Sequence, residues 1–322
     1  MEFGFAPVQS LADFNGMRAQ ATLAEALGFH TLWTHEHHSQ RMMYPDPLMA
    51  LAALAPVTSS IRLGTNMLLL PIHHPLRVAQ EAAMLDVLCE GRLSLGVANG
   101  YSERDMRAFG MLGKHRGKQL EEGLSLIRRL WQGERVTQRG DSFDLLDFEL
   151  FPLPLQRPNP PIYVGGHAKV AIDRAARLGD EYLISTTQKF DEVSALVGAY
   201  HEALAAHSKA LQKPTLNRIV CVVDNAAHKK EAEAFFASAL LALYDTWGHE
   251  SVTGLDKSER ELRVLCDDHF IIGEPRECID QIRRYEAVGI GHIACLMNFG
   301  GPDLAVVDRS MRLFGEQVLP CL

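Results

Sequence analysis

Apolar, strand-like runs alternate with helix-length segments along this whole chain, and this alternation restricts the fold more than any other feature. Eight pairs follow one another, and their strand-like runs read EFGFAPV, HTLWTH, IRLGTNMLLLP, RLSLGVANG, PPIYVGG, EYLIST, LNRIVCVVD and GHIACLMNFG. Strands that alternate with helices form parallel sheets with right-handed crossovers. Runs this apolar are buried on both faces, so eight of them favour a closed (β/α)8 barrel, the TIM barrel, over an open doubly wound sheet.

The length and the first run agree with one large barrel domain. The chain has 322 residues, of which 47% are hydrophobic, and no G-x-G-x-x-G follows the first strand-like run, which weakens a Rossmann interpretation. Two stretches lie outside the eight pairs. Residues 132–160 form an expected excursion that covers one face, and residues 245–269, polar and glycine-containing, form a candidate lid. We therefore predict a single domain over residues 1–322.

Charge and cysteine usage restrict the partners and the compartment. The net charge is −8 and the pI is about 6.0, which argues against nucleic acid or an anionic membrane surface as the main partner. No apolar run approaches the roughly 20 residues of a membrane helix. Six scattered cysteines without a C-x-x-C pair, and a start that lacks a basic segment before an apolar run, are typical of a reduced, cytoplasmic protein without a signal peptide.

The most informative polar cluster is HEHH, His35 to His38, directly after the second strand-like run. Functional groups of such barrels lie at the carboxyl ends of the strands. A metal hydrolase would also need a histidine after the sixth strand and an aspartate after the eighth, which EYLISTTQ and HIACLMNFGG lack, so we predict no metal ligands there. Histidines can also have a purely structural role, in which they bond backbone carbonyls of the loop. Three histidines and a glutamate together at one strand end nevertheless favour a functional site.

Two further stretches point to a cofactor. In PPIYVGGHAKVAIDRAA, Gly165 and Gly166 end a strand just before a helix, whose amino-terminal amides favour a phosphate, and Lys169 adds a positive charge. A Gly-Gly turn before a helix is common in any protein, but at the mouth of a barrel this stretch indicates a phosphorylated cofactor. In LGTNMLLLP, Asn66 can hydrogen-bond a cofactor edge and Met67 offers a polarizable apolar surface, although a core methionine is the simpler interpretation.

Together these motifs resemble the bacterial luciferase-like, flavin-dependent monooxygenases over nearly the whole chain. The similarity lies in ALGFHTLWTHEHH, IRLGTNMLLLPIHHPLRVAQEAAMLDVLCEGRLSLGVANGY, PPIYVGG with AARLGD, IIGEPRECIDQIRRYEAVGI and MRLFGEQVLPCL. The resemblance implies a (β/α)8 barrel that binds reduced FMN at its mouth. It also implies oxygenation of a substrate by O2 through a C4a-peroxyflavin, with the FMN reduced by a separate flavin reductase.

The resemblance also implies roles for single residues. His37 matches a general base, with Glu36 and His38 as its catalytic neighbours, and Asn66–Met67 matches a non-proline cis peptide beneath the flavin. The predicted cofactor-binding residues are Asn66, Met67, Asn99, Tyr101, Gly165, Gly166, His167, Ala168 and Lys169.

Four residues depart from the family pattern. Asn99 stands where the family often has a phosphate-binding arginine, Ala98 stands where luciferase has a reactive cysteine, and His167–Ala168 replaces a Glu–Ser pair. Light emission is therefore not implied. We expect weaker phosphate binding, or compensation by Lys169 or His167.

Two alternatives remain open at the level of sequence. One is an oxidoreductase that uses the deazaflavin F420 on the same fold, and the other is a flavin-binding protein without catalysis. The histidine cluster argues against the first, because hydride transfer needs no base that handles a peroxide. The same cluster and the candidate lid argue against the second. Apolar loop residues favour a small, apolar organic substrate, and the family implies a homodimer through helices of the first half.

Overall fold

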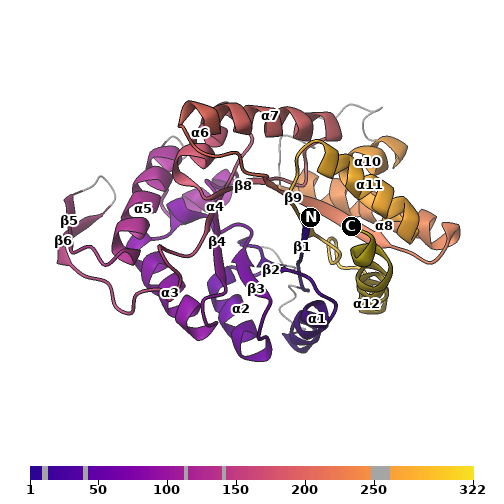
Figure 1. The fold of residues 1–322 in the computed structure, drawn as a ribbon, viewed down its shortest axis with the longest axis horizontal. Coiled ribbons are helices and arrows are strands. Elements are labelled where there is room, and N and C mark those ends of the chain that lie inside the picture. Colours follow the sequence, from indigo (N-terminus) through magenta and orange to yellow (C-terminus); the bar gives the residue numbers. More distant parts are fainter. Residues whose placement is uncertain (9–13, 39–42, 112–114, 140–142, 248–261) are drawn as a thin grey trace.

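Eight parallel strands form a closed barrel with helices around it (Figure 1). The computed structural model describes residues 1–8, 14–38, 43–111, 115–139, 143–247 and 262–322. The barrel strands are β1 (Glu2–Phe5), β2 (Thr31–Thr34), β3 (Arg62–Thr65), β4 (Leu93–Val97), β7 (Ile162–Gly165), β8 (Glu181–Ile184), β9 (Thr215–Val222) and β11 (His292–Cys295). The last strand, β11, pairs in parallel with β1, which closes the sheet. The predicted (β/α)8 barrel is thus confirmed.

Helices cover the outside of the barrel, and most of the hydrophobic core lies between them and the strands. They are α1 (Phe14–Ala26), α2 (Pro47–Leu54), α3 (Pro75–Leu88), α4 (Glu103–Ala108), α5 (Arg116–Trp131), α6 (Lys169–Leu178), α7 (Phe190–Ala206), α8 (Ala226–Trp247), α10 (Leu262–His269), α11 (Pro275–Ala287) and α12 (Leu304–Leu313). Helix α2 begins where it does because Asp46 accepts a hydrogen bond from the Met49 amide and proline occupies the first turn. Within the described ranges, no helix combines the length and hydropathy needed to cross a membrane.

One strand–helix pair was not anticipated from the sequence. Strand β9 is eight residues long; its first half lies in the barrel between β8 and β11, and its second half pairs with β10 (Phe270–Gly273). The eight predicted pairs omitted β10 and α11, although FIIG followed by an amphipathic helix has the form of a further pair. Of the candidate lid at 245–269, residues 248–261 lie outside the described residues, and 262–269 form α10.

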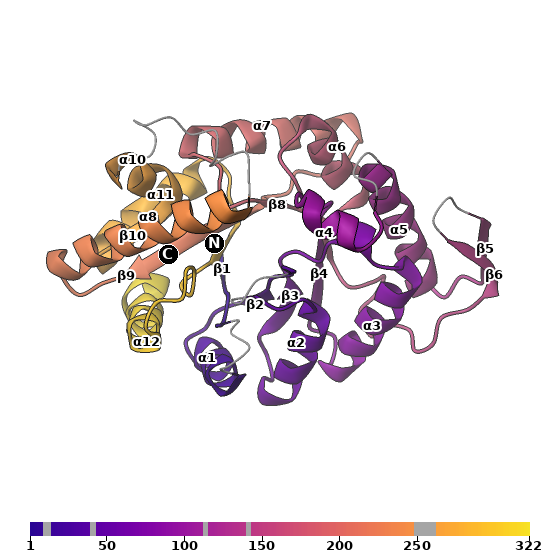
Figure 2. The ribbon, with the colours of Figure 1, turned by 180° about the vertical axis from the view of Figure 1, so that it is seen from behind.

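The excursion at 132–160 contains an antiparallel hairpin, β5 (Val136–Arg139) and β6 (Asp144–Phe148), that projects sideways from the barrel (Figures 1 and 2). The chain then returns beneath the barrel. There the Gln156 side chain donates to the Leu93 carbonyl at 2.8 Å and accepts from Arg62 at 3.0 Å, at the starts of β4 and β3. The face that this excursion covers is therefore the amino-terminal face of the barrel, opposite the mouth.

A buried tryptophan fills the barrel interior. The Trp33 side chain is fully buried, and a β-carbon added at Gly4 or Gly64 would lie 2.2 or 2.3 Å from its ring atoms. Glycine at these two positions makes room for the indole. Tyr163 packs edge-on against it, with ring centroids 5.3 Å apart. At this level the interior is thus a packed core and not a pore.

Candidate active site

A buried carboxylate organises the end of β2. The Glu36 side chain has no exposed surface, and its Oε1 accepts hydrogen bonds from Nε2 of His38 and of His73, each at 2.8 Å. Its Oε2 accepts from the Leu69 amide at 2.7 Å. Three donors from the β2 and β3 loops therefore converge on one carboxylate, which holds the two loops together.

The same contacts set the charges of the cluster. Burial by itself raises the pKa of the Glu36 carboxyl, but the hydrogen bonds from His38 and His73 outweigh it and hold that pKa below its usual value. For His73, burial lowers the pKa, and the hydrogen bond to Glu36 reverses this, so the pKa is raised. Glu36 is therefore an anion at neutral pH, and its charge favours a protonated His73.

His35 and His37, two residues apart, have different surroundings. Burial, with a smaller contribution from His37, lowers the pKa of His35 to about 3, so its imidazole is neutral at pH 7. The backbone amide of His37 donates to the Tyr44 carbonyl at 3.2 Å, and its half-buried ring faces Tyr101 with centroids 6.1 Å apart. Two of the predicted residues, His37 and Tyr101, thus meet although they follow different strands.

The predicted Asn66–Met67 pair lies at the end of β3. The peptide bond between them is cis, as the resemblance implies. The Asn66 side chain is buried and forms a reciprocal amide pair with Asn217 of β9, at 2.6 and 3.1 Å. Met67 lies against Gly165, where an added β-carbon would be 2.0 Å from its sulfur atom. The methionine can therefore reach this position only because residue 165 has no side chain.

The loop between β7 and α6 is the predicted place for an anion. Gly166 has φ = +141°, and a β-carbon there would lie 2.6 Å from that of Ala171, so the turn requires glycine. Helix α6 begins after Ala168, whose side chain offers no cap to the first-turn amides. His167, Ala168 and Lys169 are exposed. Uncapped amides at a helix amino terminus attract an anion, so these residues fit a phosphate.

Asn99 supplies a second indication of a ligand. Its side-chain Oδ1 is buried and has no hydrogen-bond partner in the structure. It lies just beyond β4, which pairs with both β3 and β7. A buried acceptor without a donor is unfavourable, so a ligand that donates a hydrogen bond at the mouth would satisfy it. The glycine turn, the uncapped helix and this acceptor together fit a phosphorylated flavin.

Four adjacent strands thus bring the predicted residues to one end of the barrel. The order β2, β3, β4 and β7 in the sheet is continuous, and their carboxyl ends carry all of the predicted catalytic and cofactor-binding residues. Two further residues of the site were not predicted from the sequence. His73 belongs to it through its hydrogen bond to Glu36, and the His-His pair after the third strand could have indicated it. Asn217 belongs to it through its hydrogen bond to Asn66, and a polar residue within an apolar strand could have indicated it.

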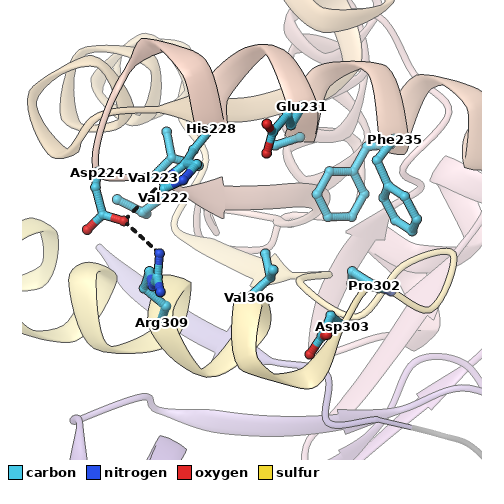
Figure 3. A pocket seen from close by; sticks show the side chains of 12 residues that line it. Val222, Val223, Asp224, His228, Glu231, Phe235, Pro302, Asp303, Val306 and Arg309 are labelled. Atoms are coloured by element: carbon cyan, nitrogen blue, oxygen red, sulfur yellow. Dashed lines mark hydrogen bonds and ion pairs between the residues drawn. The ribbon is translucent and has the colours of Figure 1, made fainter.

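A separate cavity of about 280 Å³ lies on the outer side of the barrel, between α8 and α12. Figure 3 shows Asp224 facing Arg309 and His228 at one end of it, with Phe235 and Val306 along its length. None of the predicted site residues lines this cavity. It is therefore distinct from the mouth and is not the predicted cofactor site.

Comparisons with known proteins agree with this geometry. The chain matches the family described as luciferase-like monooxygenase over residues 2–292. It is 30% identical over 293 residues to the oxygenase component of a flavin-dependent trigonelline monooxygenase from Acinetobacter baylyi, covering 83% of this chain and 78% of the relative. It is 27% identical to an F420-dependent glucose-6-phosphate dehydrogenase from Amycolatopsis mediterranei, with 94% and 92% covered. A solved monooxygenase from Streptomyces bottropensis superposes with a TM-score of 0.86 at 25% identity, covering 100% of this chain and 99% of that one.

The barrel, its polar mouth and these matches define a class of oxidoreductase. The chain belongs to the luciferase-like monooxygenase family, and the resemblance drawn from its motifs is confirmed. The relatives include both flavin-dependent monooxygenases and F420-dependent enzymes. Family membership by itself therefore leaves the cofactor to be argued from the residues of the mouth.

Proposed function

We propose that this protein is a monooxygenase that uses reduced FMN and O2 to oxygenate a small, apolar organic substrate. When bound, reduced FMN supplies the two electrons that activate O2. One oxygen atom enters the substrate and the other leaves as water. The observation that carries the proposal is that one mouth combines an anion-binding helix terminus with a histidine cluster held by a buried carboxylate.

The residues of β4 and β7 would hold the cofactor. The amides that begin α6, with Lys169 beside them, bind the phosphate, and Gly165–Gly166 lets the backbone approach it. Asn99 accepts a hydrogen bond through its unpaired Oδ1. Met67 provides an apolar contact for the ring system.

The residues of β2 and its loop would handle the proton. His37 acts as the acid–base group, because its imidazole is partly exposed and histidine is the side chain that most often serves in general acid–base catalysis. Glu36 is a positioning residue, since its side chain has no exposed surface and it fixes His38 and the β3 loop. His38, which packs against Phe109 at 4.6 Å between ring centroids, links the cluster to α4.

Two partners complete the proposal. A separate flavin reductase supplies the reduced FMN, and two copies of the chain associate through α2 and α3. The surface supports the second statement, because Met49 of α2 and Met84 and Leu88 of α3 are 69%, 56% and 55% exposed on neighbouring helices. Exposed apolar side chains on neighbouring helices favour an association surface there.

The proposal is tested by stopped-flow absorbance after anaerobic protein loaded with FMNH2 is mixed with oxygenated buffer. We expect oxidised flavin to appear after a lag that free FMNH2 lacks, and expect a panel of aldehydes and ketones to contain compounds that are oxygenated with O2 uptake. Oxidation as fast as that of free FMNH2, with only hydrogen peroxide as product, would contradict the proposal.

The F420-dependent relative defines the second candidate function. Reduced F420 is titrated under the same conditions as reduced FMN. Tighter binding of F420, with substrate turnover that consumes no O2, would replace the monooxygenase proposal with hydride transfer on the same barrel.

A further inference from the structure

Three ionisable side chains gather at the amino-terminal face of the barrel, opposite the mouth. Glu2 begins β1 and His292 begins β11, and these two residues are in register on adjacent strands. His30 directly precedes β2, and its amide donates to the Phe3 carbonyl of β1 at 2.7 Å. The three side chains therefore come from neighbouring positions in the sheet, where the last strand meets the first.

Their ligand atoms have the spacing of a coordination site. Glu2 Oε2 lies 3.4 Å from His30 Nδ1 and 3.7 Å from His292 Nδ1, and the three atoms all lie within 4.8 Å of one another. In a tetrahedral zinc site with bonds of about 2.0–2.1 Å, neighbouring ligand atoms are about 3.3 Å apart. Small side-chain movements would therefore place these three atoms around one ion.

An independent observation points to a missing partner at the same place. The His292 side chain is 3% exposed, and its Nδ1 is buried without a hydrogen-bond partner. This atom faces the Glu2 carboxylate at a distance too long for a hydrogen bond. With the ring proton of His292 moved to Nε2, a cation between the two could bind both Nδ1 and the carboxylate.

We propose that Glu2, His30 and His292 form a binding site for a divalent transition-metal ion, with zinc as the fitting ion. Two imidazoles and a carboxylate are zinc ligands of the usual kinds. Glu2 and His30 have side-chain exposures of 57% and 35%, which leaves a path from solvent and room for water as the fourth ligand. The ion would join β11, β1 and β2 across the seam of the barrel, a structural role remote from the mouth.

Metal binding changes two contacts, and one of them provides a reporter. The Trp33 indole N–H donates to His292 Nε2 at 3.4 Å, so the ring proton of His292 lies on Nδ1 without metal. Coordination at Nδ1 moves this proton to Nε2 and opens the contact with Trp33. The hydrogen bond between His30 Nδ1 and the Thr31 hydroxyl, at 2.8 Å, is also replaced by the bond from Nδ1 to the metal. Tryptophan fluorescence should therefore report occupancy.

The test is titration of the chelator-treated full chain with Zn²⁺, followed by tryptophan fluorescence and equilibrium dialysis. Co²⁺ serves as a second probe, because its visible absorption distinguishes tetrahedral from octahedral coordination. We expect one ion per chain, tetrahedral Co²⁺ absorption, and at least tenfold weaker binding in both Glu2→Gln and His30→Gln. The matched control is His207→Gln, which removes another surface histidine–carboxylate pair, with Asp173 at 2.8 Å, and should bind as the wild type does.

Three results would overturn the proposal. The first is wild-type binding no tighter than that of the folded Glu2→Gln and His30→Gln variants, whose circular dichroism must match the wild type. The second is an octahedral Co²⁺ spectrum. The third is binding that survives Glu2→Gln but disappears in His38→Gln, which would assign the metal to the histidine cluster at the mouth.

Discussion

Neighbouring residues of the chain can differ completely in what their side chains are able to do. Glu36 and His37 are adjacent, yet the carboxylate is enclosed by two histidines and an amide, while the imidazole beside it reaches the mouth and Tyr101. The alternation of side chains at the end of β2 produces this difference. We therefore expect Glu36 to position its neighbours and the partly exposed His37 to transfer the proton.

The first prediction concerns His37. Replacing it with alanine should lower the rate of oxygenation by roughly 10²–10⁴-fold, the range that a general acid–base group contributes, and leave the affinity for reduced FMN unchanged. Single-turnover oxygenation and anaerobic flavin titration measure the two quantities. Equal loss of the oxygenation rate and of the FMN affinity would assign His37 to cofactor binding instead. The control is His201→Ala, on helix α7.

A second prediction concerns a buried carboxyl at the amino-terminal face of the barrel, at the start of β8. Burial is the main cause that raises the pKa of Glu181 to about 7, although Thr215 and Tyr163 donate hydrogen bonds to it. The folded state thus binds a proton more tightly than the unfolded chain. The resulting stabilisation is complete below about pH 4.5 and is lost as the pH rises through about 7, a difference of about 3 kcal/mol.

Glu181→Gln should therefore be more stable than the wild type at pH 8 by up to about 3 kcal/mol and should gain much less at pH 5. Urea unfolding at pH 5, 6, 7 and 8 measures the free energies of unfolding of both proteins. Glu286→Gln, on an exposed position of α11, should show no such trend. A difference between Glu181→Gln and wild type that is independent of pH would refute the assignment.

At the scale of single elements, the amino terminus of α6 lacks a side chain that caps its first amides. Ala168 occupies the N-cap, where serine, threonine or aspartate would stabilise the helix. A helix terminus that a protein leaves uncapped at a predicted cofactor site is available to bind the cofactor's anion.

The third prediction follows from this competition. Ala168→Asp should stabilise the protein by about 0.5–2 kcal/mol through the new cap and weaken the binding of reduced FMN at least tenfold through repulsion of its phosphate. Ala168→Ser is the matched variant, since it caps without charge and should weaken binding less. Thermal unfolding and anaerobic titration give the two quantities; unchanged FMN affinity in Ala168→Asp would exclude the phosphate from this terminus.

At the scale of the whole molecule, exposed apolar surface on α2 and α3 predicts a dimer. These helices lie side by side in both views of the fold (Figures 1 and 2). Leu88→Lys combined with Met84→Lys should convert the dimer to a monomer in sedimentation velocity. Leu211→Lys, at a residue 72% exposed outside these helices, is the control and should leave the dimer intact. A wild-type monomer at micromolar concentration would contradict the prediction.

Much of the barrel could be predicted from the sequence because it depends on local pattern. Each strand-like run and the helix after it are recognised within about twenty residues, and the order of the strands follows from right-handed crossovers. Strand β10 and the helix after it have the local pattern of a further pair, but the pairing of β10 with the far half of β9, outside the barrel, depends on the tertiary structure. The hairpin β5–β6 was not predicted because its strands are largely exposed and carry little apolar pattern.

The sequence by itself determined which residues end the strands, and therefore that HEHH, Asn66, Asn99 and the Gly165–Gly166 turn share one end of the barrel. Only the tertiary structure decided which side chains meet there. Asn66 pairs with Asn217, 151 residues away, and Glu36 binds His73 across two loops. Likewise, Glu2 faces His292 because the last strand closes against the first. Local pattern is encoded in neighbouring residues, whereas such contacts depend on how a closed sheet brings distant strands into register.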